Sequence, residues 1–256
     1  MKNYRIVLVS VALALTACSK GSAPKAENLT PSTHPSDGSK VTSQQPQATI
    51  QSSSLPNPDP GVSFEKYQTI TSGNQLMFIY YALSGMPVDY KQIASNYSVD
   101  YRSTQDEFKK NDILNSLKPT IDSNIANAKN NRYLVWTIDN TPLSHYDFSS
   151  KSFTTQQEIP TNSSYGYYQD VPQYHITFTN AKNYTALRVS DESLAKKIES
   201  MVSNPNSLFS LKIYAFAQGV DLSNRTVNCL ITKVELFGKP NIYDAKSNDA
   251  LLFTQQ

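Results

Sequence analysis

The sequence predicts an α+β domain, in which N-terminal helices pack on a largely antiparallel β-sheet and one further helix is inserted between strands. Between residues 72 and 128, apolar side chains recur at intervals of three and four residues, which is the period of an amphipathic helix. From residue 133 onwards they alternate with polar side chains, which is the period of a half-buried strand. The first helices need a flat apolar surface to pack against, and the later strands supply one.

Two short helices are expected first. Ser72 and Gln75 have the spacing of a capping box that begins the first helix, and Gly85 should end it. Asp89 is the expected N-cap of the second helix. The side chains that should face the core follow helical spacing: Leu76, Ile79, Tyr80 and Leu83 in the first helix, and Tyr90, Ile93, Ala94 and Tyr97 in the second.

A third helix is predicted to begin at Thr104-Gln105-Asp106-Glu107, which has the pattern of a capping box. Pro119 should kink or restart this helix, because proline lacks an amide hydrogen and suits a first helical turn. The expected apolar stripe consists of Phe108, Ile113, Leu114, Leu117, Ile121, Ile125 and Ala128.

The strands follow. Leu134, Trp136 and Ile138 share one face of the first predicted strand. In the last strand the apolar parity changes between Ile231 and Val234, which a bulge near Thr232 and Lys233 would explain. Further strands are expected at residues 143–148, 173–179, 184–189, 209–217 and 226–237. Between them, Asp191 should open a helix whose inward side chains are Leu194, Ile198, Met201 and Val202.

Residues 1–17 have the features of a secretory signal peptide. Lys2 and Arg5 precede an apolar run that is shorter than the about 20 residues needed to span a bilayer. The run leads into Leu15-Thr16-Ala17-Cys18, which looks like a bacterial lipobox. The resemblance implies cleavage before Cys18, a diacylglyceryl group on its thiol and usually acylation of the new amino terminus. The alternative is an ordinary secretory peptide with a cysteine at its cleavage site.

The segment after the lipobox predicts a location and a tether. Ser19 follows the cysteine in place of the aspartate associated with inner-membrane retention, which favours the outer membrane if the cell is Gram-negative. Residues 18–60 are rich in Ser, Thr, Pro and Gln, so we expect a disordered tether. Residues 61–256 should form a single domain in the periplasm or at the cell surface, with the membrane as partner through the lipid on Cys18.

Composition and motifs give little indication of a catalytic, metal or nucleic-acid-binding site. The formal net charge of +2 argues against a nucleic-acid partner. Cys229 alternates with apolar residues, which indicates a core position. His145 and His175 occur without the spacing of a metal site, and neither a metal nor another cofactor is predicted. His145 and Asp147 share a face of a predicted strand, so His145, Asp147 and His175 are weak polar candidates.

A tyrosine-rich stretch lies in a polar loop between residues 159 and 172. Tyr165, Tyr167 and Tyr168 offer large, rigid surfaces with hydrogen-bonding tips, as in loops that recognise protein or glycan. These three tyrosines are therefore a candidate binding loop. The alternative is that their rings fold back over the sheet.

Three stretches resemble an uncharacterised domain family of bacterial exported proteins. They are Arg132-Tyr133-Leu134-Val135-Trp136, Tyr146-Asp147-Phe148, and Ala186-Leu187-Arg188-Val189-Ser190-Asp191-Glu192. The resemblance implies no activity, so two functions stay open. The first is a non-catalytic binding or assembly module with an envelope protein or glycan as partner; the second is an envelope hydrolase that uses His145 or His175.

Overall fold

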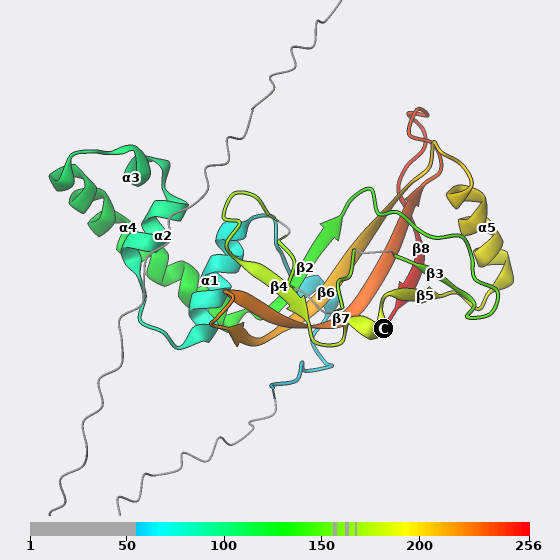
Figure 1. Cartoon of the computed structure of the whole chain (residues 1–256), viewed down its shortest axis with the longest axis horizontal. Helices are drawn as coiled ribbons and strands as arrows, with labels where there is room; N and C mark the ends of the chain where they lie inside the picture. Colours follow the sequence, from blue (N-terminus) through cyan, green and yellow to red (C-terminus); the bar gives the residue numbers. More distant parts are fainter. Residues whose placement is uncertain (1–54, 156–157, 162–163, 167) are drawn as a thin grey trace, which may run out of the picture. The chain divides into compact units, whose positions relative to one another are not determined.

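A long antiparallel hairpin forms the centre of the sheet in the computed structural model, which describes residues 55–155, 158–161, 164–166 and 168–256 (Figure 1). The hairpin consists of β6 (Leu208–Asp221) and β7 (Thr226–Lys239). β2 (Tyr133–Ile138) pairs antiparallel with β6, and β8 (Ala250–Gln255) pairs antiparallel with β7. The largely antiparallel sheet that the sequence predicts is therefore confirmed.

Parallel pairs occur at the margins of this sheet. β1 (Gln68–Thr69) pairs with β2, and β4 (His175–Phe178) pairs with β7, which gives the order β1-β2-β6-β7-β4. A separate two-stranded sheet joins β3 (Ser152–Thr154) to β5 (Ala186–Arg188). The sequence does not predict β1, β3 or β8.

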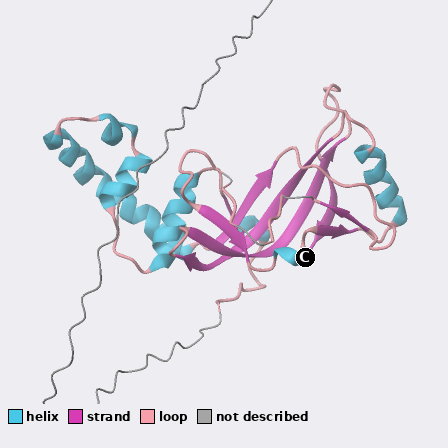
Figure 2. Ribbon diagram, in the orientation of Figure 1, coloured by secondary structure: helices cyan, strands magenta, loops and turns pink. Residues whose placement is uncertain are grey.

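The helices lie at both ends of the sheet, as Figure 2 shows. The N-terminal group consists of α1 (Gly73–Ser84), α2 (Tyr90–Tyr97), α3 (Val99–Ser103) and α4 (Glu107–Asn130). α5 (Glu192–Val202) lies between β5 and β6 in the chain, and the 3-10 helices are η1 (Phe64–Lys66) and η2 (Ala181–Asn183). None of the helices in the described ranges is both long and apolar enough to cross a membrane.

The capping predictions hold for most helices. Ser72 and Gln75 form the predicted capping box, Asp89 caps α2, and Asp191 caps α5. The prediction for α4 is wrong in detail, because Asp106 is the N-cap in place of Thr104, and its carboxylate accepts the Phe108 and Lys109 amides. α4 therefore begins later, and Phe108 is 87% exposed instead of buried. α4 then continues through Pro119 without restarting.

The main core lies between α1 and one face of the sheet. α1 packs on β6, β7 and α4, and its buried side chains meet strand residues such as Leu134 and Ile213. Trp136 stacks on Phe178 with ring centroids 5.5 Å apart. Cys229 is fully buried in this core, as predicted, and burial raises the pKa of its thiol to about 12.

The opposite face of the sheet is covered by the segment that includes η1. Tyr67, Val135 and Tyr214 form a second apolar cluster there, with Phe64 packed against it. The ammonium of Lys233 lies 3.8 Å from the centre of the Phe64 ring and 2.7 Å from Glu235 Oε1. This arrangement buries an ion pair beneath an aromatic cover.

The predicted bulge in β7 is confirmed. Tyr214 of β6 pairs with Lys233 and Ala215 pairs with Ile231, so Thr232 is the extra residue. The bulge allows Ile231 and Val234 to face the same core although three positions separate them.

The strand predicted at residues 143–148 is wrong. Only an isolated bridge between Asp147 and Ser152 forms there. The carboxylate of Asp147 accepts the Ser149 amide at 2.8 Å and the Ser150 hydroxyl at 2.7 Å, which closes a turn at the position of the expected strand. His145 therefore lies in a loop, and the shared face predicted for His145 and Asp147 does not exist.

Candidate functional site

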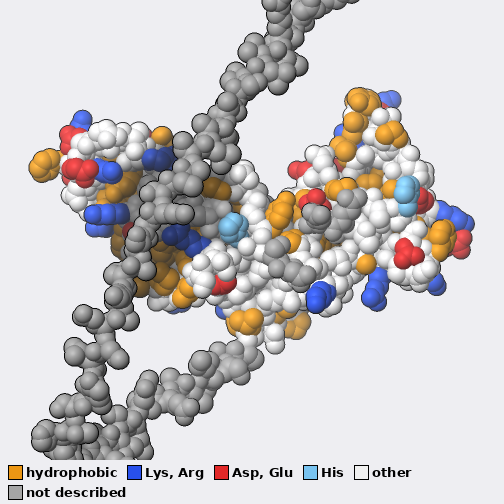
Figure 3. Space-filling view, in the orientation of Figure 1, with side chains coloured by type: hydrophobic (Ala, Val, Ile, Leu, Met, Phe, Trp, Pro, Cys, Tyr) orange, Lys and Arg blue, Asp and Glu red, His pale blue; other side chains and the backbone are white. Residues whose placement is uncertain are grey.

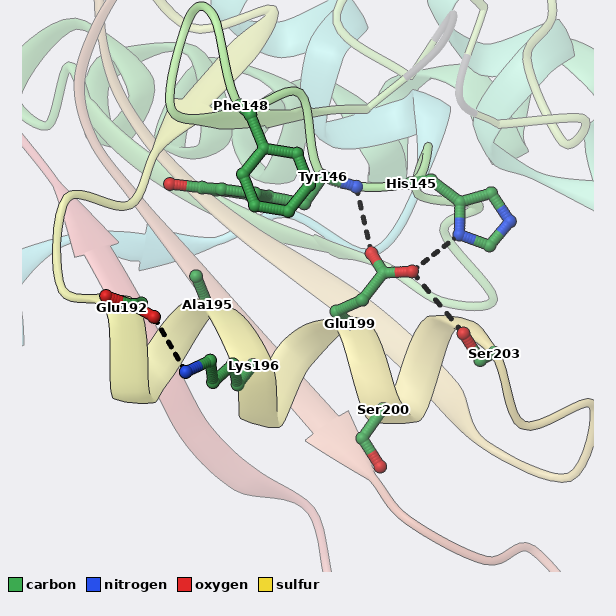
Figure 4. Close-up of a pocket in the computed structure, with 9 residues that line it drawn as sticks. All are labelled: His145, Tyr146, Phe148, Glu192, Ala195, Lys196, Glu199, Ser200 and Ser203. Atoms are coloured by element: carbon green, nitrogen blue, oxygen red, sulfur yellow. Dashed lines mark hydrogen bonds and ion pairs between the residues drawn. The ribbon is translucent and has the colours of Figure 1, made fainter.

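A cavity of about 530 Å³ lies between α5 and the loop that follows β2 (Figure 4). The loop contributes His145, Tyr146 and Phe148. α5 and its C-cap residue contribute Glu192, Ala195, Lys196, Glu199, Ser200 and Ser203. Two segments far apart in the sequence therefore build the site.

The periodicity of α5 explains which side chains reach the cavity. Ile198 and Met201 are buried and hold one face of the helix against the domain. Glu192, Lys196 and Glu199 recur at positions i, i+4 and i+7, which places them together on another face. Figure 3 shows positive and negative side chains interspersed around α5, so no large field of one sign surrounds the cavity.

Tyr146 fixes the loop side of the cavity. Its hydroxyl donates to the Val189 carbonyl at 3.0 Å, and its ring packs against Phe153 with centroids 5.1 Å apart. Its backbone amide donates to Glu199 Oε2 at 2.9 Å. Phe148 then rests edge-to-face on the Tyr146 ring and is 84% exposed. A large aromatic side chain is thus held out in solvent by a rigid support.

One carboxylate ties the two segments together. Nδ1 of His145 lies 2.7 Å from Glu199 Oε1 and donates to it, because a carboxylate only accepts, and the Ser203 hydroxyl donates to the same oxygen at 3.4 Å. Burial raises the pKa of Glu199, but the hydrogen bonds from His145 and the Tyr146 amide, with the charge of His145, outweigh it and lower this pKa. Glu199 therefore stays ionised at neutral pH.

The structure brings His145 together with Glu199, which sequence reasoning missed, and not with Asp147. A hydrolase would need a nucleophilic hydroxyl at the other imidazole nitrogen. In Figure 4 that nitrogen points away from Ser200 and Ser203. The hydrolase alternative stays a prediction without a nucleophile in this arrangement.

The remaining sequence candidates lie outside this cavity. His175 is in β4, beside Gly166, where a Cβ would meet its ring at 3.2 Å. Tyr165 bridges to Ile176, whereas the Tyr168 hydroxyl donates to the Ile70 carbonyl at 2.6 Å and burial raises the pKa of that phenol to about 12. Tyr168 therefore folds back onto the domain.

Some candidates fall outside the described residues. These are Cys18, Tyr167, the signal peptide and most of the tether. At the end of the tether, the Pro56 carbonyl accepts from Gln218 Nε2 at 3.1 Å and the Asp59 amide donates to the Tyr133 hydroxyl at 2.7 Å. Contacts with the domain thus begin before the boundary that the sequence predicts at residue 60.

Within the described ranges, no group of three or more His, Cys, Asp or Glu side chains is arranged to hold a metal ion. No family model, no curated protein and no solved structure matches the chain. The resemblance to an exported-protein domain family stays a prediction.

Replacing Glu199 with glutamine should destabilise the domain in a pH-dependent way. The lowered pKa of Glu199 means that its stabilisation is present above its ordinary value of 4.5 and is lost as pH falls through the folded-state pKa. We expect a loss of about 1 kcal/mol at pH 7, because the side chain is 34% exposed and solvent screens it. The loss should be smaller at pH 3 than at pH 7.

Urea unfolding midpoints of the wild type and of Glu199→Gln at both pH values measure this difference. Glu192→Gln is the matched control, since Glu192 pairs with Lys196 on the same helix but is largely exposed. Its midpoint should stay close to that of the wild type. Equal losses for Glu199→Gln at pH 7 and pH 3 would show that the carboxylate charge is not what ties the loop to α5.

Proposed function

We propose that this chain is a lipid-anchored protein of the cell envelope whose domain is a non-catalytic binding module. The cavity between α5 and the loop after β2 receives an apolar side chain of a protein partner. The observation that carries the proposal is Phe148, which is 84% exposed beside a cavity of about 530 Å³. Exposed aromatic side chains on rigid supports are typical anchors of protein interfaces.

The chemistry of the cavity favours an uncharged, apolar occupant. Tyr146, Phe148 and Ala195 supply apolar walls. The carboxylates at the rim already have cationic or imidazole partners: Glu192 lies 2.6 Å from Lys196, and Glu199 lies 2.7 Å from His145. A charged group that entered would lose its hydration without finding a free counter-charge. An aliphatic or aromatic side chain would instead bury apolar surface on both partners.

The support of the cavity also suits binding. The hydroxyl, the ring and the amide of Tyr146 all contact the domain. The loop therefore loses little conformational entropy when a partner binds. Tyrosine and phenylalanine lose few rotatable bonds on contact, which adds to this preorganisation.

The anchoring part of the proposal rests on the sequence. The expected signal peptide, the lipobox at Cys18 and the tether at 18–60 together support a location at a membrane, and Ser19 favours the outer membrane if the cell is Gram-negative. A module on such a tether can search for partners tens of ångströms from the bilayer. The domain would face the periplasm or the cell surface.

Site-specific photocrosslinking in living cells tests the proposal. We expect a benzophenone amino acid in place of Phe148 to give a discrete crosslinked protein. The same probe in place of Phe108 is the matched control, because Phe108 is 87% exposed but lies at the start of α4. A discrete product at position 148 alone supports the cavity as the docking site. No product at 148, or the same products at both positions, contradicts it.

Phe148→Ala should separate binding from stability. Removal of a side chain this exposed should change the free energy of unfolding by less than about 0.5 kcal/mol. Affinity for the crosslinked partner should fall at least about tenfold, which corresponds to about 1.4 kcal/mol. Titration of the purified partner against both variants measures the ratio. An unchanged affinity would remove Phe148 from the interface.

A further inference from the structure

A second, polar cleft lies among the N-terminal helices. It occupies about 280 Å³ between α1, the C-terminal half of α4, the end of α2 and β1. Its polar lining consists of Gln68, Ser72, Asn74, Gln75, Asn124 and Asn127. No Asp, Glu, Lys or Arg lines the cleft among the described residues, so an ionic ligand would find no counter-charge there.

Part of this polar lining is already used by the fold. Gln75 Oε1 accepts the Thr71 amide at 2.7 Å and the Ser72 amide at 3.2 Å, and Gln75 Nε2 donates to the Thr69 carbonyl. Asn74 Nδ2 donates to Asp170 at 3.1 Å. These bonds hold α1 and β1 in place and use both polar atoms of Gln75. Asn74 Oδ1, by contrast, is buried and has no hydrogen-bond partner in the part of the chain that the structure describes.

Three carboxamides remain. The side chains of Gln68, Asn124 and Asn127 make no hydrogen bond to the part of the chain that the structure describes. Asn124 and Asn127 are three residues apart on α4 and therefore share a face. Each carboxamide offers two donors and one acceptor oxygen. The cleft thus presents a dense, uncharged set of donors and acceptors to one small volume.

An aromatic ring borders the same cleft. Tyr97, the last residue of α2, is 39% exposed. Phe78 of α1 holds the Tyr97 ring edge-to-face, with centroids 5.5 Å apart and an interplanar angle of 70°. The sequence predicts Tyr97 as a core residue, and the structure shows it half in solvent. Its ring is an apolar surface next to the free amides.

We infer that this cleft binds a neutral saccharide. Sugar hydroxyls both donate and accept, so they match carboxamides, and the C–H face of a pyranose ring can lie on Tyr97. An apolar ligand would leave the three amides unpaired, which is costly once they are desolvated. An extended peptide places its donors and acceptors along a line and suits a sheet edge better than a compact cleft. The small volume accommodates one or two sugar rings and predicts affinity on the order of millimolar.

Ligand-observed saturation-transfer NMR on the full-length protein in detergent tests the inference. The probes are N,N′-diacetylchitobiose, maltose and trialanine at up to about 10 mM. We expect at least one disaccharide to bind and trialanine not to bind. Absence of binding by both disaccharides, or stronger binding of trialanine, would overturn the inference.

Variants locate the binding. The pair Asn124→Ala/Asn127→Ala should weaken disaccharide binding at least about tenfold, because two hydrogen-bonding groups are lost. Tyr97→Ala should weaken it as well. Asn115→Ala/Ser116→Ala is the matched control on the same helix, since these residues do not line the cleft. Alanine favours helix, so the α4 variants should fold. Equal binding by both α4 double variants would contradict the site.

Discussion

Replacement of Cys18 with serine should move the protein almost completely from the membrane fraction to the soluble fraction. Under the lipobox interpretation, the Cys18 thiol carries the diacylglyceryl group, and a hydroxyl is not an equivalent acceptor. Each buried methylene contributes about 0.8 kcal/mol, so two or three acyl chains hold a protein on a bilayer far more firmly than one. Loss of all of them removes the membrane anchor that the lipobox predicts.

Fractionation with immunoblotting, together with metabolic labelling by palmitate, measures this effect. Cys229→Ala is the matched control: Cys229 is the other cysteine of the chain, it is fully buried, and its removal should leave both labelling and membrane association intact. A Cys18→Ser protein that is still labelled and still pelleted with membranes would refute the anchor.

Local signals account for the parts of the fold that the sequence predicts. A capping box such as Ser72 with Gln75 involves neighbouring residues only, and its outcome depends little on the rest of the molecule. The signal for the bulge at Thr232 is equally local, because it consists of the change of apolar parity within β7 itself. α5 was predictable for the same reason, since Asp191 and the helical spacing after it stand together.

A local side-chain turn and a tertiary strand pairing explain two elements that the sequence misplaces or does not predict. At residues 145–148 polar and aromatic side chains alternate as they do in a strand, but the Asp147 carboxylate closes a turn instead. The sequence does not predict β8, because Leu251, Leu252 and Phe253 are consecutive apolar residues and do not alternate with polar ones. Only the pairing with β7 decides that Leu252 is buried and Leu251 is exposed.

The candidate site was beyond the reach of the sequence for a similar reason. His145 and Glu199 are 54 positions apart, and nothing in either segment signals the other. Glu199 by itself reads as one more charge on the polar face of an amphipathic helix. From the sequence alone, Phe148 is predicted to end a strand. Only the packing of α5 beside the loop turns these residues into one cavity.

Removal of the Glu235 carboxylate should destabilise the domain more than removal of the Glu199 or the Glu192 carboxylate. Lys233 and Glu235 have side chains only 9% and 13% exposed, and their charged atoms lie 2.7 Å apart. Glu235→Ala would leave the Lys233 ammonium buried and would also remove the acceptor of the Tyr214 hydroxyl, now 3.0 Å away. Breaking a buried pair in this way costs about 3–5 kcal/mol. Urea unfolding at pH 7 measures the loss.

A double variant identifies the cause of that loss. In Lys233→Met/Glu235→Leu, both charges are replaced by apolar side chains of similar length, so no unpaired ion remains beneath the Phe64 ring, which now lies 3.8 Å from the Lys233 ammonium. The double variant should lie within about 1 kcal/mol of the wild type, because a buried ion pair contributes little beyond its own desolvation cost. Phe64 and Tyr214 would still cover the new side chains and exclude water. If the double variant is as unstable as Glu235→Ala, the carboxylate acts mainly through Tyr214 and packing, and the unpaired ammonium is not the cause.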